Sequence, residues 1–133
     1  MHMDRPVFVF GSDLAGHHDS GDALVALRTR GAVYGQGSGL QGGAYAIPTR
    51  QITGQPRAPH EIAESVSACL HFTRIRPWAL FDVARVGCGA AGYKAEEIAP
   101  MFAAAPHNVT LHKVFEDILA RRTIGNTQGV QTS

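Results

Sequence analysis

The chain has 133 residues, 44% of them hydrophobic and 17% charged, which predicts one globular domain large enough to bury its own core. Lysine and arginine total 12 against 11 acidic residues, and this net charge of +1 excludes a broad positive surface for a nucleic-acid backbone but allows a small anionic ligand. No apolar run approaches the roughly 20 residues of a membrane span, and the start MHMDRPVFVF lacks the layout of a signal peptide, so we expect a cytoplasmic protein without a membrane partner.

The chain begins with a pattern for a strand and then a helix. The segment RPVFVFG, residues 5–11, is typical of a buried strand that ends at Gly11. A helix is expected from Ser20 to Arg30, because serine favours a helix start and Gly31 favours its end.

A glycine-rich run follows, with short strands predicted on either side of it. These strands are AVYGQ, residues 32–36, and AYAIP, residues 44–48. A phosphate-binding glycine loop leads directly into a helix, whereas this run leads into a strand. We therefore predict that the run shapes the approach to a site and does not hold a phosphate itself.

The second half alternates helices and strands. Pro59 suits the first turn of a helix, which is expected to continue from His60 to about Arg76. WALFDVARV, residues 78–86, is predicted as a central strand. The helix from His60 to about Arg76 is expected to have one buried stripe, made of Ile62, Val66, Cys69, Leu70 and Thr73.

After residue 86 the pattern predicts a glycine turn and then helix, strand and helix. Pro100 is expected to divide the first helix near Ile98, because an interior proline is costly. NVTLH makes the last strand and KVFEDILARR the last helix. Residues 1–124 are thus predicted to form one domain, and residues 125–133, without an apolar pattern, a disordered tail.

This order predicts an α/β fold: a three-layer sandwich whose mostly parallel mixed sheet has helices on both faces. Ligands bind such sheets beyond the carboxyl ends of the strands. Three segments should meet there, namely GSDLAGHHDSG, the corner at Thr49 and Arg50, and VGCGAAGY.

The segment VGCGAAGY is the first candidate for ligand binding. Gly87, Gly89 and Gly92 would let the backbone approach a ligand, and the helix after them would offer free amides to a phosphate. The alternative is a tight turn with no ligand. Cys88 has no histidine base near it in sequence, and a buried, reduced thiol is the favoured interpretation for it and for Cys69.

The segment GSDLAGHHDSGD is the second candidate. Adjacent His17 and His18 cannot both point the same way in an extended loop, and no second cluster of ligands accompanies them, so we predict no metal site. A solvated polar loop is the alternative. Arg50 and Arg85, each near a strand end, are candidate partners for a phosphate or carboxylate, or else structural arginines.

Three segments together, VFVFGSDLAGHH, GAVYGQGSGLQGGAYAIPTR and VGCGAAGYKAEEIAPMF, resemble a family of small bacterial and phage proteins related to macrodomains. The likeness runs from about Val7 to Leu111. It is closest to the branch that includes terminal ADP-ribose glycohydrolases and the antitoxins that reverse DNA ADP-ribosylation, which pairs a PTK strand end with a GCG loop. The order and spacing of three motifs make the likeness more specific than one motif alone.

The resemblance implies a macrodomain-like pocket for ADP-ribose or a related nucleotide, with ADP-ribosylated protein or nucleic acid as further partners and no cofactor. The loop from Gly11 to Gly21 is implied to surround the adenosine and distal ribose, and GCGAAGY the pyrophosphate. The ligand-binding residues expected on this basis are Gly11, Ser12, Asp13, Leu14, Gly16, His17, Gly21, Thr49, Arg50, Gly87, Cys88, Gly89, Ala90, Ala91, Gly92 and Tyr93.

The sequence departs from that branch where the resemblance places catalysis. In the branch a lysine of PTK attacks the sugar carbon and an acid after GCGL assists, whereas this chain has Arg50 and no acid at residues 90–92. A guanidinium stays protonated and is a poor nucleophile, so Arg50 is expected to bind charge and not to attack. The acids Asp13, Asp19 and Asp22 also replace uncharged residues expected in relatives, which favours a less anionic ligand.

Three hypotheses follow. The first is a module that binds ADP-ribose or a related nucleotide. The second is a hydrolase of ADP-ribosyl bonds that uses a water molecule oriented by Asp13 or His17 as general base. The third is a non-catalytic interaction protein whose pocket is vestigial.

Overall fold

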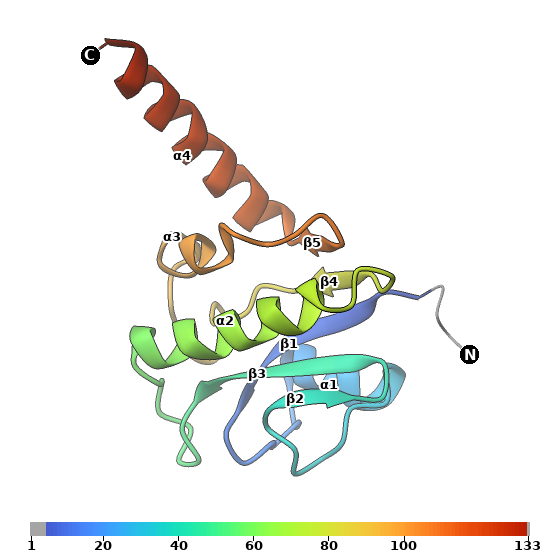
Figure 1. Cartoon of the computed structure of the whole chain (residues 1–133). Helices are drawn as coiled ribbons and strands as arrows, with labels where there is room; N and C mark the ends of the chain where they lie inside the picture. The colour runs from blue at the N-terminus through green and yellow to red at the C-terminus, as the bar shows by residue number, and fades with distance from the viewer. Residues whose placement is uncertain (1–4, 133) are drawn as a thin grey trace.

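The computed structural model of the chain describes residues 5–132, and the side chains of residues 5–122. The sheet has the order β2-β3-β1-β4-β5, with β2 antiparallel to β3 and the other neighbouring pairs parallel (Figure 1). The α/β class and the mostly parallel mixed sheet are therefore confirmed. The elements in chain order are β1 (Val7–Asp13), α1 (Gly21–Thr29), β2 (Gly39–Gln41), β3 (Ala44–Arg50), α2 (Pro59–Arg74), β4 (Phe81–Val83), α3 (Ala95–Ile98), the 3-10 helix η1 (Ala99–Phe102), β5 (Val109–Leu111) and α4 (Lys113–Thr132).

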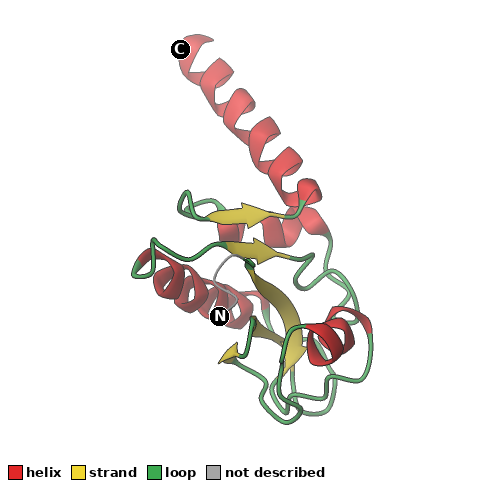
Figure 2. Ribbon diagram, turned by 90° about the vertical axis from the view of Figure 1, so that its right-hand side faces the viewer, coloured by secondary structure: helices red, strands yellow, loops and turns green. Residues whose placement is uncertain are grey.

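Helices cover both faces of the sheet, as the sequence predicts. Successive side chains of a strand point to opposite faces, so Phe8 and Phe10 of β1 pack on the side of α1, whereas Val9 packs on the side of α2. Figure 2 shows α1 and α2 on opposite sides of the strands. The core between α1 and the sheet is small, because the buried residues of this helix, Ala23 and Ala26, have small side chains that let it approach the sheet closely.

The larger core lies between the sheet and the helices α2, η1 and α4. All five residues predicted for the stripe of α2 are buried in the structure. Phe102 of η1 and Phe115 of α4 are fully buried and stack with ring centroids 5.6 Å apart. Burying an aromatic side chain of this size contributes about 1.5–3 kcal/mol, so these contacts hold the C-terminal elements on the sheet.

The predicted strand at residues 32–36 is wrong. The segment is a turn, in which the amide of Gln36 donates to the carbonyl of Val33 at 3.1 Å and Gly35 has a φ of +94°. Val33 and Tyr34 are exposed, so their apolar character contributes nothing to a sheet. The strand beside β3 comes later in the glycine run, as β2.

Two further strand predictions need correction. The first strand does not stop at Gly11 but continues to Asp13, because the ladder between β1 and β3 extends that far. The strand predicted from residues 78–86 is much shorter, since β4 has only three residues. Its predicted place inside the sheet is confirmed, because β4 pairs in parallel with β1 on one edge and with β5 on the other.

The C-terminal part agrees with the predicted break and differs in its tail. Helix α3 ends at Ile98 and Pro100 lies in the first turn of η1, where its missing amide costs nothing. Helix α4 continues to Thr132 through residues predicted to be a disordered tail, because extending an anchored helix is easier than starting one. Its later turns project beyond the sheet (Figure 1). No helix within residues 5–132 is both long and apolar enough to span a membrane.

Candidate functional site

The candidate site lies at the carboxyl ends of β1 and β3. These strands run in parallel and end side by side, with Asp13 opposite Arg50. The two glycine turns meet in the same region, because a Cβ atom on Gly11 would lie 3.5 Å from the amide nitrogen of Gly87. The fold thus brings the three predicted segments to one edge of the sheet.

A cavity of about 100 Å³ opens between these segments. It combines the first turn of α1, the end of β3 and the turn after β4. Eight of the predicted ligand-binding residues line it: Gly11, Gly21, Thr49, Arg50, Gly87, Gly89, Ala90 and Ala91. Ser20, Asp22, Ala23 and Arg85 complete the lining.

The polar groups around this cavity favour an anion. No hydrogen bond within the described residues uses the backbone amides of Gly89, Ala90 and Ala91. Helix α1 adds its own first-turn amides, since Ser20 makes no capping hydrogen bond through its side chain. The guanidinium groups of Arg50 and Arg85 add two positive charges.

Asp22 is the opposing charge. It lies in the first turn of α1, where a carboxylate is favourable to the helix dipole, and it also lines the cavity. An anion in the cavity therefore meets two arginines and one carboxylate, which leaves a net positive lining.

The predicted phosphate site at a helix start after the second glycine turn needs revision. Helix α3 is only four residues long, and its first turn is occupied by its own contacts. The amide of Lys94 donates to Oε2 of Glu97 at 2.8 Å. The donors on this side of the cavity are therefore the amides of the turn, and the helix that contributes is α1.

Eight predicted residues lie outside the lining of the cavity. Tyr93 donates its hydroxyl to the carbonyl of Arg57 at 2.6 Å, which ties the second turn to the segment before α2. Leu14 is exposed, and its amide donates to the carbonyl of Arg50 at 3.0 Å. The complete set outside the lining is Ser12, Asp13, Leu14, Gly16, His17, Cys88, Gly92 and Tyr93.

Asp13, His17 and Arg50 form a cluster of polar side chains that meets the cavity through Arg50. The carboxylate of Asp13 is 2% exposed, accepts the amide of His17 at 3.1 Å and lies 3.1 Å from its ring Nδ1. Arg50 approaches Asp13 at 3.9 Å and also lines the cavity. Burial raises the pKa of Asp13, but the hydrogen bonds from His17 and the amide of Gly16 outweigh it and lower the pKa below its usual 3.8.

The two histidines point in different directions, which confirms the prediction from their adjacency. The His17 ring is 46% exposed. His18 is fully buried, with Nε2 at 3.1 Å from both the carbonyl of Gln36 and Oε1 of Gln41. His18 therefore fastens the site loop to the glycine run.

Close backbone packing gives the glycine run a structural role. A Cβ atom on Gly37 would lie 2.2 Å from the carbonyl oxygen of Asp13, and one on Gly16 would lie 2.4 Å from the amide nitrogen of Gln36. Ser12 donates its hydroxyl to the carbonyl of Gly37 at 2.6 Å. The run thus supports the end of β1, where Asp13 lies opposite Arg50 of β3.

Cys88 has the features of a structural thiol. Burial raises its pKa, although the charge of Arg85 acts in the opposite direction. The thiol donates to the carbonyl of Val86 at 3.7 Å. The thiolate needed for nucleophilic attack is therefore disfavoured.

A second cavity of about 490 Å³ adjoins the first and shares Asp22 and Arg85 with it. It lies on the face of the sheet next to α1, where Phe8 provides apolar surface and Asp82, His112 and Lys113 add polar groups.

Comparisons of the chain with models of known protein families, with curated proteins and with solved structures found no match. The site is therefore interpreted from its own geometry.

The sequence analysis missed three lining residues, Ser20, Asp22 and Ala23. The helix start was identified, and a helix start after a strand is itself a signal for anion binding. The sequence analysis assigned this signal to the helix after the second glycine turn instead. The choice between the two helices depends on their lengths, since α1 has nine residues whereas α3 has only four.

Proposed function

We propose that this protein binds ADP-ribose or a related nucleotide, with a phosphate in the cavity between α1, Arg50 and the turn at residues 87–92. The observation that supports it best is the convergence of two arginines and two sets of unpaired backbone amides on one small cavity. Such donors suit a phosphate in both charge and geometry. The resemblance to macrodomain relatives is an independent reason to choose ADP-ribose as the first ligand to test.

The volumes suggest how such a ligand would be divided. Drug-sized ligands occupy sites of about 300–1,000 Å³, so a cavity of about 100 Å³ suits a phosphate and not a whole nucleotide. The adjoining cavity of about 490 Å³ is large enough for a base and sugar. Asp22 and Arg85, which border both, would contact the junction between these parts.

Calorimetric titration with ADP-ribose tests this proposal, with adenosine as the ligand that lacks phosphate. We expect saturable heat with ADP-ribose and at least tenfold weaker binding of adenosine, because adenosine gains nothing from the arginines. Equal binding of the two would contradict the phosphate site. Absence of heat at millimolar ADP-ribose would contradict nucleotide binding and favour the interaction protein with a vestigial pocket.

Gly89 offers a matched pair of variants for the same titration. A Cβ atom there meets no heavy atom within 4 Å, and the residue lines the cavity. Gly89→Leu should therefore fold normally and fill the cavity, abolishing binding. Gly89→Ala, which adds one methyl group, should retain binding, and equal loss in both variants would contradict the steric argument.

A second candidate function is hydrolysis of an ADP-ribosyl bond, favoured by the pairing of His17 with Asp13. A buried carboxylate that holds ring Nδ1 leaves Nε2 of a half-exposed ring free to take a proton from water. Release of ADP-ribose from ADP-ribosylated DNA or protein would be the assay. A rate unchanged by both His17→Ala and Asp13→Ala would contradict this role, and Arg28→Gln serves as a distant control.

A further inference from the structure

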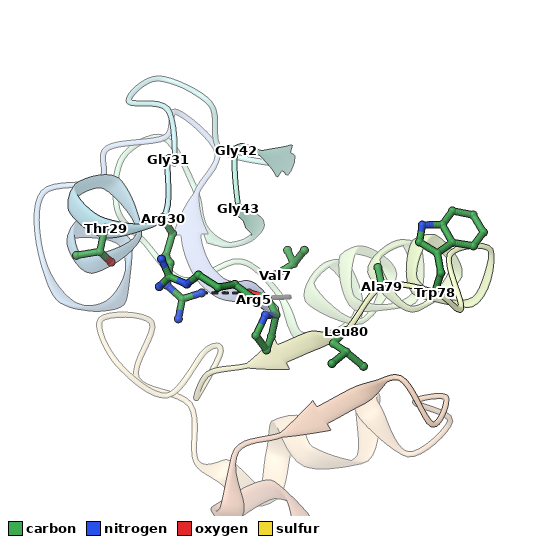
Figure 3. Close-up of a pocket in the computed structure, with 11 residues that line it drawn as sticks. Arg5, Val7, Thr29, Arg30, Gly31, Gly42, Gly43, Trp78, Ala79 and Leu80 are labelled. Atoms are coloured by element: carbon green, nitrogen blue, oxygen red, sulfur yellow. Dashed lines mark hydrogen bonds between the residues drawn. The ribbon is translucent and has the colours of Figure 1, made fainter. Parts of the chain in front are cut away.

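The largest cavity of these three lies at the opposite end of the sheet. It has a volume of about 600 Å³ and is formed at the amino ends of β1, β3 and β4, close to the end of α1 (Figure 3). The proposed nucleotide site is at the carboxyl ends of the strands. The proposed nucleotide binding does not involve the cavity of about 600 Å³, so the residues that line this cavity need a separate explanation.

One side of the cavity carries positive charge. Arg5 and Arg30 line it, and within residues 5–132 no aspartate or glutamate does. Arg30 is held in place, because its Nη1 donates to the carbonyl of Pro6 at 3.1 Å and its guanidinium lies 5.4 Å from the centre of the Phe8 ring. Among the described side chains, neither arginine has a carboxylate within salt-bridge distance.

The other side is apolar. Val7, Ala79 and Leu80 line it, and Trp78 lies at its outer rim (Figure 3). Trp78 is 73% exposed and Leu80 is 54% exposed, although large apolar side chains gain free energy on leaving water. An exposed tryptophan beside a cavity is a typical anchor for a ligand.

We propose that this cavity binds a small organic anion with a flat apolar body, such as an aromatic carboxylate, sulfonate or phosphate. The anionic group would pair with Arg5 and Arg30, while the apolar body would cover Val7, Ala79 and Leu80 and reach Trp78. The volume of about 600 Å³ falls within the range of small-molecule sites. The two arginines in the lining, with no acid beside them among the described residues, favour an anion over a cation or a neutral ligand.

The fluorescence of Trp78 provides a local assay, because it is the only tryptophan of the chain. The probe is anilinonaphthalene sulfonate, an aromatic anion, and its uncharged counterpart is phenylnaphthylamine. We expect the anion to quench Trp78 saturably at one probe per chain. The uncharged compound should bind about tenfold more weakly, since it cannot pair with a guanidinium.

Variants separate charge from apolar contact. Arg5→Gln should weaken binding of the anion about tenfold, whereas Arg28→Gln removes the same charge from an exposed position outside the cavity and should leave it unchanged. Leu80→Ser should weaken binding of both probes, with Leu40→Ser, at another exposed leucine, as its control. Arg5 is preferred to Arg30 because Arg30 also makes structural contacts.

Three results would overturn the proposal. They are quenching that does not saturate, equal affinity for the charged and uncharged probes, and equal weakening by Arg5→Gln and Arg28→Gln. Sedimentation of the free protein tests the competing occupant: a dimer dissociated by Leu80→Ser and unaffected by Leu40→Ser would assign the surface to a second copy. Titration of ADP-ribose is unaffected by these outcomes, because the two cavities lie at opposite ends of the sheet.

Discussion

Replacing Gly37 with alanine tests whether the glycine run supports the candidate site. The added Cβ atom would lie 2.2 Å from the carbonyl oxygen of Asp13 and 2.6 Å from that of Leu14, so backbone must move on one side or the other. Overpacking of this kind costs about 1–3 kcal/mol. Displacing the carbonyl of Gly37 would also weaken its buried hydrogen bond with Ser12, worth about 1 kcal/mol.

We therefore expect Gly37→Ala to lower the free energy of unfolding by about 2–4 kcal/mol. For a domain of this size that is a fall in melting temperature of about 6–16 °C. Urea unfolding followed by circular dichroism measures the first quantity, and thermal unfolding the second. The shift of Asp13 should also move Arg50, so binding of ADP-ribose should weaken in the same variant.

Gly89→Ala is the control for this experiment. Neither glycine has a positive φ, and Gly89 has open space where the methyl group would go, so only Gly37→Ala creates a backbone clash. Gly89→Ala should change stability by less than about 1 kcal/mol. If Gly37→Ala were as stable as Gly89→Ala, the close packing of the glycine run on Asp13 would be refuted.

Three further predictions concern charge and thiol chemistry. Arg50→Gln should weaken ADP-ribose binding about tenfold, measured by calorimetry, and Arg28→Gln should not; equal effects would exclude a direct contact. Asp13→Asn should lower the free energy of unfolding at neutral pH, because the folded pKa of Asp13 is below 3.8. This loss of stability should shrink as the pH falls below 3.8 and through the folded pKa. A loss that stays constant in denaturant melts at each pH would contradict the linkage. Burial raises the pKa of the Cys69 thiol to about 12, so a thiol reagent near pH 8 should modify Cys69 only after unfolding. Cys88, which is half-buried, should react earlier. Rapid modification of Cys69 in the native protein, detected by mass spectrometry, would contradict its burial.

Local patterns were sufficient for the elements whose signals are strong. The stripe of α2 recurs at helical spacing over several turns, and its five predicted residues are all buried. Pro100 predicted the break between α3 and η1, because proline restricts the backbone in any context. The alternation of strands and helices likewise predicted the parallel sheet with helices on both faces.

Short segments were less predictable. AVYGQ at residues 32–36 was predicted as a strand and is a turn, whereas GLQ at residues 39–41, where no strand was predicted, pairs with β3. The difference depends on distant contacts: His18 and Ser12 bond to the carbonyls of Gln36 and Gly37 and hold this part of the run against the site loop. Such contacts join residues more than fifteen positions apart, which a local pattern cannot report.

The sequence by itself determined the order of the main elements, the parallel sheet and the edge at which the glycine turns would meet, because these follow from local periodicity and from the direction of parallel strands. Only the tertiary structure decided which donors converge. It turned Arg50, Arg85 and the first turn of α1 toward one cavity, and it placed Asp13 beside Arg50 and His17. It also brought Arg5, Arg30 and Trp78, from three separate segments, around the cavity of about 600 Å³ at the other end of the sheet. The direction in which a side chain points depends on strand pairing and helix packing, and these are properties of the assembled fold.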